Sequence, residues 1–258
     1  MLALIAGEGA LPGLIAPEAG FTAALAGNPP QIPTDVTFRL EHLGTLLQTL
    51  KDKGVTEVCF AGAVKRPAFD PSQIDRATLP LVQRLAATFE QGDDAALRGI
   101  LEIFEEAGFT IHAAHQLIPE VLPDPGVPTE RQPDGMAKAS AARAAEVLAI
   151  IAPADIGQGC VAHKGQIIAI EAALGTAWML ESLQNRTDGA GGLFYKAPKT
   201  NQDRRVDLPT IGPDTVSQAA DAKLDGIVIE AGGVMILDQA RTVAEADARG
   251  LFLWVRTP

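Results

Sequence analysis

Short apolar runs alternate with longer amphipathic stretches along the first half of the chain. Leu2–Ala6, Glu57–Ala61 and Phe109–Ala113 have the length and composition of buried strands. Between them, His42–Lys53 has helical spacing and stops at a glycine, and residues 93–107 predict a second helix that also ends at a glycine. Alternation of strands and helices is typical of a parallel, doubly wound sheet. The pattern therefore predicts a Rossmann-like α/β domain.

The pattern changes at residues 122–135, LPDPGVPTERQPDG. This stretch holds four prolines and two glycines and has no apolar periodicity, which is typical of a linker. We therefore expect two domains, an N-terminal α/β domain over residues 1–125 and a C-terminal α/β domain over residues 136–258.

The second half predicts a mixed α/β domain. Met136–Ile151 has the composition of an alanine-rich helix, and Lys164-Gly165 separates two runs, Gly159–His163 and Gln166–Glu171, that we expect to form a hairpin. Further helices and strands are expected at Gly175–Leu183, Thr215–Lys223, Gly226–Glu230, Val234–Leu237, Gln239–Arg249 and Leu251–Val255. The stretch from residue 184 to residue 212 is interpreted as irregular and polar.

Composition narrows the classes of function. The chain has 258 residues and a formal net charge of −11, which argues against general nucleic-acid binding and against electrostatic adhesion to anionic lipid headgroups. Its two cysteines, Cys59 and Cys160, lie in separate apolar runs, so we expect core thiols and a cytoplasmic location. The first apolar run lacks the basic start of a signal peptide, and no run approaches the roughly 20 residues that span a bilayer.

The first candidate site is the glycine turn at residues 7–13, GEGALPG, between a predicted strand and a predicted helix. Glycines there let backbone N–H groups approach a phosphate or a sugar. A dinucleotide fingerprint would require a glycine where Pro12 stands, which weighs against NAD. A tight turn without a ligand is the alternative. The candidates for substrate binding are Gly7, Gly9, Ala10 and Leu11.

Charged residues follow two other first-half elements. Lys65 and Arg66 come after the strand Glu57–Ala61, where the carboxyl end of a parallel strand meets ligands, and their cations suit a phosphate. A solvated basic loop is the alternative. Asp93 and Asp94 begin the next helix, and a carboxylate there either caps the helix or contacts a ligand or a hard cation. We take Asp94 as a candidate.

The second half contributes a turn and a strand end. Gln158 stands between two glycines and can present its amide to a ligand. Glu171 ends an apolar strand, where an unpaired buried carboxylate is costly, so it either reaches solvent or meets a partner. Thr176 follows downstream and is a candidate with them.

The richest segment is Lys196–Gly212, where four cations and two carboxylates fall within twelve residues. Cations can neutralise a pyrophosphate, and a neighbouring carboxylate can hold Mg²⁺ or orient a water molecule. Arg205 and Asp207 would share one face of an extended strand. A surface loop of salt bridges is the alternative. The catalytic candidates are Lys196, Arg205 and Asp207, and the binding candidates are Lys199 and Gln202.

Several segments together resemble one known family, the LpxI-type UDP-2,3-diacylglucosamine pyrophosphatases of lipid A biosynthesis. The resemblance runs along nearly the whole chain and rests on the joint order and spacing of its motifs. They are IAGEGALP (5–12), CFAGAVKRPAF (59–69), GDDAALR (92–98), DIGQGCV (155–161), EAALGTAWML (171–180), KAPKTNQDRRVDLPTIGPDT (196–215), GIVIEAG (226–232) and GLFLW (250–254).

The resemblance implies a two-domain hydrolase that binds UDP-2,3-diacylglucosamine between its domains and releases UMP and 2,3-diacylglucosamine 1-phosphate (lipid X). It also implies use of Mg²⁺ (or Mn²⁺), with Asp207 of the DLPTIG motif as the carboxylate tied to activity and to the metal. An acylated substrate implies transient contact with the cytosolic face of the inner membrane. A homodimer is compatible with this reading.

Two other classes stay open at the level of sequence. A nucleotide-dependent oxidoreductase would use the Rossmann-like first domain, and NAD(P)H binding would reveal it. A non-catalytic protein that binds a nucleotide-sugar or a lipid would bind without hydrolysis, and an assay of UMP release separates it from the enzyme.

Overall fold

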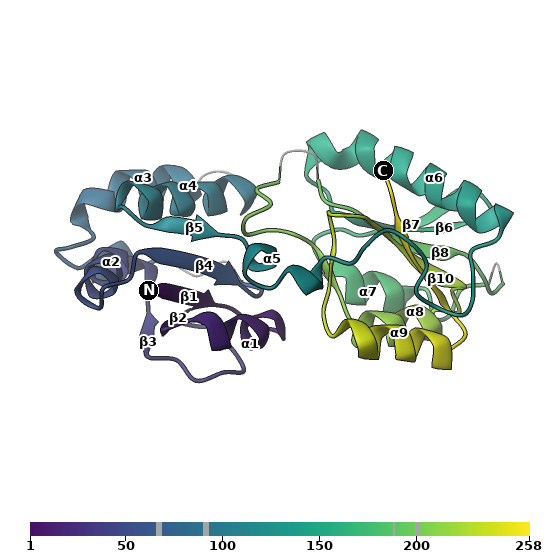
Figure 1. The fold of residues 1–258 in the computed structure, drawn as a ribbon. Coiled ribbons are helices and arrows are strands. Elements are labelled where there is room, and N and C mark those ends of the chain that lie inside the picture. The colour runs from purple at the N-terminus through teal and green to yellow at the C-terminus, as the bar shows by residue number, and fades with distance from the viewer. Residues whose placement is uncertain (66–68, 90–92, 188, 200–201) are drawn as a thin grey trace. The chain divides into compact units, whose positions relative to one another are not determined.

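The computed structural model describes residues 1–65, 69–89, 93–187, 189–199 and 202–258. The chain forms two compact units (Figure 1). The first unit contains Met1–Pro119 and the short segment Asp203–Val206. The second contains Glu120–Gln202 and Asp207–Pro258.

The first unit is built on a parallel sheet with the strand order β3-β2-β1-β4-β5. Its strands are β1 (Leu2–Ala6), β2 (Phe21–Leu25), β3 (Val36–Phe38), β4 (Glu57–Ala61) and β5 (Thr110–His112). Every residue of β1 and β2 is buried, as expected where both faces of a parallel sheet are covered. The predicted parallel α/β architecture of this half is confirmed.

Helices complete the first unit and close its core. They are α1 (Leu11–Ile15), α2 (Leu43–Asp52), α3 (Val82–Phe89), α4 (Asp93–Glu106) and α5 (Ala114–Leu117). Leu50 from α2 and Phe104 from α4 are almost fully buried, and Phe104 meets Phe60 edge to face with ring centroids 5.1 Å apart. Two strands, β2 and β3, were not predicted from the sequence.

The second unit is built on a mixed sheet with the order β12-β10-β8-β6-β7. β8, β10 and β12 are parallel to one another, and β6 is antiparallel to its neighbours β7 and β8. The strands are β6 (Gly159–His163), β7 (Gln166–Ile170), β8 (Leu193–Lys196), β10 (Gly226–Glu230) and β12 (Phe252–Arg256), with a separate pair β9 (Thr210–Ile211) and β11 (Met235–Ile236). The predicted mixed fold and the predicted hairpin are confirmed.

Helices cover both faces of the second sheet (Figure 1). One face carries α6 (Gly135–Ile151), and the other carries α7 (Gly175–Ser182), α8 (Pro213–Asp221) and α9 (Gln239–Ala248). Asp134 caps α6 by accepting a hydrogen bond from the backbone N–H of Ala137. In the described part of the chain, no helix is long and apolar enough to cross a membrane.

One prediction for the second half is wrong. The stretch before Gly212 was interpreted as irregular, yet Leu193–Lys196 forms β8, a central strand between β10 and β6. Only four residues long and preceded by glycines, this strand has no alternating pattern that could mark it. Its backbone hydrogen bonds to two neighbouring strands stabilise it instead.

The proline-rich stretch at residues 122–135 pairs with the last strand. The backbones of Gly126 and Val255 exchange hydrogen bonds of 3.0 and 2.8 Å, and the N–H of Leu253 donates to the buried hydroxyl of Thr129 at 2.9 Å. This segment therefore covers the outer edge of β12, whose N–H and C=O groups would otherwise be unpaired.

Candidate functional site

A polar cluster lies at the carboxyl ends of β7 and β8 in the second unit. Lys196 is the last residue of β8 and pairs with Gly159, the first residue of the antiparallel strand β6. Glu171 directly follows β7, and its N–H donates to the carbonyl of Gly159 at 2.8 Å. The order β8-β6-β7 therefore brings together two charged residues that lie in separate motifs. Ligands of open α/β sheets bind at this kind of edge.

Lys196, Thr176 and Glu171 form one connected group. The Nζ of Lys196 donates to the Oγ1 of Thr176 at 2.6 Å, and that hydroxyl donates to Oε1 of Glu171 at 2.9 Å. Nζ also lies 3.6 Å from Oε2 of Glu171. Lys196 is 6% exposed and Glu171 is 8% exposed, so both charges are almost removed from water.

Burial sets the electrostatics of this group. Desolvation lowers the pKa of Lys196 below its ordinary value, and the carboxylate of Glu171 opposes the shift. The Oε2 atom of Glu171 is buried and has no hydrogen-bond partner among the described residues. An ammonium group has three donors, so Lys196 can donate to a phosphate oxygen while it keeps its bond to Thr176.

Two glycines allow the close approach of this carboxylate. A Cβ atom at Gly157 would collide with the carbonyl of Glu171, and one at Gly159 would collide with Oε2 of the same residue. The sequence indicated these glycines as flanks of Gln158. In the structure they also make room for Glu171.

The loop after β8 is tied to the turn before β6. Nε2 of Gln202 donates to Oε1 of Gln158 at 3.1 Å, and the backbone N–H of Lys199 donates to Oε1 of Gln202 at 3.0 Å. Lys199 forms an ion pair with Asp155. Gln158 was predicted as a binding residue in one segment and Lys199 and Gln202 in another, and the structure brings the three together in the second unit.

Arg205 belongs to the first unit, in its short segment Asp203–Val206. Its guanidinium pairs with Asp203 at 2.7 Å and with Glu105 of α4 at 2.6 Å. These carboxylates raise the pKa of Arg205, and hydrogen bonding to Arg205 lowers the pKa of Asp203. The expectation that Arg205 and Asp207 share a face of an extended strand is wrong, because Arg204–Val206 forms a turn and Asp207 belongs to the second unit.

Asp207 is half-buried at the point where the chain re-enters the second unit. It precedes two buried residues, Leu208 and Pro209. The carbonyl of Pro209 accepts a 2.9 Å hydrogen bond from the N–H of Met235. The backbone beyond Asp207 is therefore held by β11, and α8 begins six residues downstream at Pro213.

In the first unit, the two predicted turns meet at the carboxyl ends of β1 and β4. The backbones of Glu8 and Ala63 exchange hydrogen bonds of 2.8 and 2.9 Å, and Nζ of Lys65 pairs with Glu8 at 3.0 Å. The side chain of Asn28 accepts a 2.6 Å hydrogen bond from the N–H of Lys65. Sequence reasoning missed Asn28, because the strand that precedes it was not predicted.

The remaining predicted binding residues of the first unit differ in their burial. Gly7 is buried, and a Cβ there would collide with the carbonyl of Ala63. Gly9 and Ala10 are exposed, while Leu11 is buried as the first residue of α1. Arg66 lies outside the described residues, as does the side chain of Asp94.

Comparison with known proteins identifies the family. The family model for the LpxI N-terminal domain matches residues 1–121, and the model for the LpxI C-terminal domain matches residues 124–254. The chain belongs to the LpxI family. A curated relative from Caulobacter vibrioides, named UDP-2,3-diacylglucosamine pyrophosphatase LpxI, is 38% identical over 219 residues, which cover 82% of this chain and 78% of the relative.

The donor set of this LpxI chain bears on its expected metal. Within the ranges that the structure describes, no group of three or more His, Cys, Asp or Glu side chains is placed to hold a metal ion. Mg²⁺ is commonly held by one or two carboxylates together with the phosphates of a substrate. Asp207 fits that kind of partial site, whereas a complete protein cage does not occur among the described residues.

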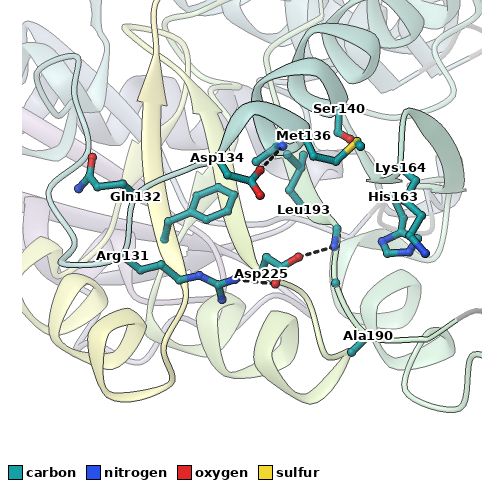
Figure 2. A pocket seen from close by; sticks show the side chains of 14 residues that line it. Arg131, Gln132, Asp134, Met136, Ser140, His163, Lys164, Ala190, Leu193 and Asp225 are labelled. Atoms are coloured by element: carbon teal, nitrogen blue, oxygen red, sulfur yellow. Dashed lines mark hydrogen bonds and ion pairs between the residues drawn. The ribbon is translucent and has the colours of Figure 1, made fainter.

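A pocket of about 460 Å³ lies in the second unit, at the amino ends of β8 and β12 (Figure 2). The Lys196 group lies at the other end of β8. It is lined by the amino end of α6, the end of β6 and the starts of β8 and β12. Among the residues that line it, Arg131 pairs with Asp225 at 2.7 Å, and Asp225 also accepts a hydrogen bond from the N–H of Gly192 at 2.8 Å. None of the residues predicted for the LpxI site lines it.

Proposed function

We propose that this chain hydrolyses the pyrophosphate of UDP-2,3-diacylglucosamine to UMP and 2,3-diacylglucosamine 1-phosphate. The observation that carries the proposal is the buried group of Lys196, Thr176 and Glu171 at the carboxyl edge of the second sheet. It occurs in a chain of the LpxI family, and the relative at 38% identity is named for this pyrophosphatase.

In this proposal Lys196 contacts the pyrophosphate. A cation that is already desolvated and oriented by Thr176 and Glu171 stabilises developing negative charge with little reorganisation. Glu171 holds the ammonium group charged and in place. The amides of Gln158 and Gln202, which bond to one another, are available to polar groups of the same substrate.

The first unit is proposed to bind another part of the substrate through the turn of Lys65. The 3.0 Å ion pair of Lys65 with Glu8 is largely exposed, so it is worth little, and an incoming anion can replace Glu8. Arg205 is more firmly held than Lys65, because its guanidinium pairs with two carboxylates, those of Glu105 and Asp203, and not with one. Its catalytic role stays a prediction.

We propose further that Asp207 acts with Mg²⁺. The ion would neutralise charge on the pyrophosphate when bound, and Asp207 would hold it together with substrate oxygens. Hydrolysis should then stop in the presence of a chelator and return on addition of Mg²⁺ or Mn²⁺. Full activity in the presence of the chelator would contradict the role of the metal ion, but it would not contradict the contact of Lys196 with the pyrophosphate.

The deciding experiment follows UMP release from UDP-2,3-diacylglucosamine. Asp207→Ala should lower the rate by about a hundredfold or more, the order found when one stabilising group is removed from a hydrolytic site. Asp214→Ala is the matched control, since this exposed aspartate lies in the first turn of α8 in the same segment. Absence of UMP release from the unmodified protein would favour a protein that binds the lipid without catalysis.

The substrate also bears on location. Because the proposed substrate carries two acyl chains, we propose transient contact with the cytosolic face of the inner membrane. Flotation with vesicles measures this contact, and sedimentation measures whether the protein forms the homodimer that the family resemblance allows.

A further inference from the structure

Asn28 is a buried polar residue of the first unit with no part in the function proposed above. Its exposed fraction is 2%, although it lies in the loop between β2 and β3. Burying an amide costs free energy unless its polar groups are hydrogen-bonded. The partners of the Asn28 side chain therefore show what this residue holds in place.

A tight turn fixes the backbone of Asn28. Its N–H donates to the carbonyl of Leu25, the last residue of β2, at 3.0 Å and closes a four-residue turn. Gly27 stands at the third position of this turn with a φ of +86°, which glycine adopts without steric cost. The N–H of Ala26 donates to the carbonyl of Phe38, the last residue of β3, at 2.7 Å. The turn is thus tied to both strands, and the side chain of Asn28 starts from a fixed backbone.

The side chain of Asn28 binds both backbone groups of Lys65. Oδ1 accepts a hydrogen bond from the N–H of Lys65 at 2.6 Å, and Nδ2 donates to the carbonyl of Lys65 at 3.4 Å. A carboxamide has an acceptor and two donors, so one side chain satisfies both groups. Lys65 lies in the loop after β4, and β1 lies between β2 and β4 in the sheet. Asn28 therefore joins the loops that follow two strands which are not neighbours.

The loop after β1 holds the side chain of the same lysine. Nζ of Lys65 pairs with Glu8 at 3.0 Å, and the backbones of Glu8 and Ala63 exchange two hydrogen bonds. The side chain of Lys65 is 77% exposed, so packing does little to fix its ammonium group. The anchored backbone therefore sets which space the ammonium group can reach.

We propose that Asn28 is a positioning residue for Lys65, and that it acts on the affinity for the substrate and leaves the chemical step unchanged. The inference rests on the proposed function, in which Lys65 binds one part of the substrate in the first unit. An anchored backbone reduces the conformational entropy that Lys65 loses when its ammonium group meets an anion. A contact that is equally strong in the bound substrate and in the transition state changes KM and not kcat.

Steady-state kinetics of UMP release test the inference. Asn28→Ala should raise the KM for UDP-2,3-diacylglucosamine by about tenfold and leave kcat within about twofold of its original value. A loss of stability alone would lower kcat, because less of the enzyme is folded, and would leave KM unchanged. Asn28→Ser is the milder variant if the alanine variant does not fold, and it should raise KM in the same direction.

Thr78→Val is the matched control for the loss of a buried hydrogen bond. Thr78 is fully buried in the same unit, and its Oγ1 accepts a hydrogen bond from the N–H of Gly44 at 2.8 Å. Because this bond does not hold Lys65, the variant should leave KM unchanged. An equal rise of KM in the Thr78 and Asn28 variants would overturn the inference.

A double-mutant cycle shows whether Asn28 acts through Lys65. Lys65→Ala should itself raise KM by about tenfold or more, because it removes a charged donor. Asn28→Ala added to Lys65→Ala should raise KM by less than about twofold, since the group that Asn28 positions is then gone. A tenfold effect of Asn28→Ala in both backgrounds would overturn the inference, as would a fall in kcat with an unchanged KM.

Binding of UDP separates the inference from its premise, because UDP carries the nucleotide part of the proposed substrate and its binding needs no catalysis. Titration calorimetry gives the Kd of UDP for the four proteins of the cycle. The same non-additive pattern in a protein that releases no UMP would reject the proposed hydrolysis and retain the role of Asn28. UMP release with additive effects on KM would reject that role and retain the hydrolase. Absence of UMP release, with UDP binding that is absent or unchanged by Asn28→Ala, would reject both.

Discussion

The buried pair of Lys196 and Glu171 makes a quantitative prediction about stability. Glu171→Gln keeps an oxygen that can accept from Thr176 but removes the charge that faces Lys196. Breaking a buried ion pair by removing one partner typically costs about 3–5 kcal/mol. Here Oε2 of Glu171 lies 3.6 Å from Nζ, longer than a hydrogen bond, so we expect the free energy of unfolding to fall by about 2–3 kcal/mol.

The same variant should change how stability depends on pH. Because burial lowers the pKa of Lys196 from 10.5, the unfolded chain binds more protons between the folded and the unfolded value, and stability rises with pH across that interval. Without the carboxylate of Glu171, which opposes the lowering, the folded-state pKa falls further. The rise in stability should therefore begin at a lower pH in Glu171→Gln.

Urea unfolding of both proteins between pH 7 and pH 10 measures the two effects. Glu245→Gln is the control, because Glu245 pairs with Arg249 on the surface of α9 at 3.0 Å and such pairs are worth about 0–1 kcal/mol. The double variant Glu171→Gln, Lys196→Met removes both charges and should recover part of the loss. Equal losses at Glu171 and Glu245, or a double variant no more stable than Glu171→Gln, would refute the reasoning.

Three further predictions concern packing. Gly159→Ala should lower the free energy of unfolding by about 1–3 kcal/mol, because the new Cβ would collide with the buried carboxylate of Glu171. Gly135→Ala is the control and should leave the stability unchanged, because the space around Gly135 is open. The melting temperatures of the two variants measure the difference. Thr129→Val should cost about 1–3 kcal/mol in urea unfolding, because a buried N–H of β12 would lose its acceptor, and an unchanged midpoint would contradict that role. Cys59 and Cys160 should resist alkylation at pH 8 until the protein is denatured, because burial raises the pKa of both thiols to about 12; rapid native labelling would show otherwise.

Much of the architecture could be predicted from local pattern. β1 and β4 have the predicted bounds, and α2, α4 and α6 lie within a residue or so of theirs, since long periodic helices and short apolar runs between glycines carry a strong signal. β8 had no such signal. Its four residues become a strand because β6 and β10 pair with its two edges.

The sequence by itself determined that this chain has two α/β halves, an acidic and mainly apolar composition, and polar motifs after its strands. It also placed Lys196, Glu171 and Thr176 among the candidates, but with Lys196 in a different motif from the other two and with no means of joining them. Only the tertiary structure decided that they form one buried group, that Arg205 pairs with Glu105 and Asp203, and that Leu174 and Trp178 are exposed. The physical reason is that propensity and periodicity act over a few residues, whereas ion pairing and burial depend on which strands lie side by side.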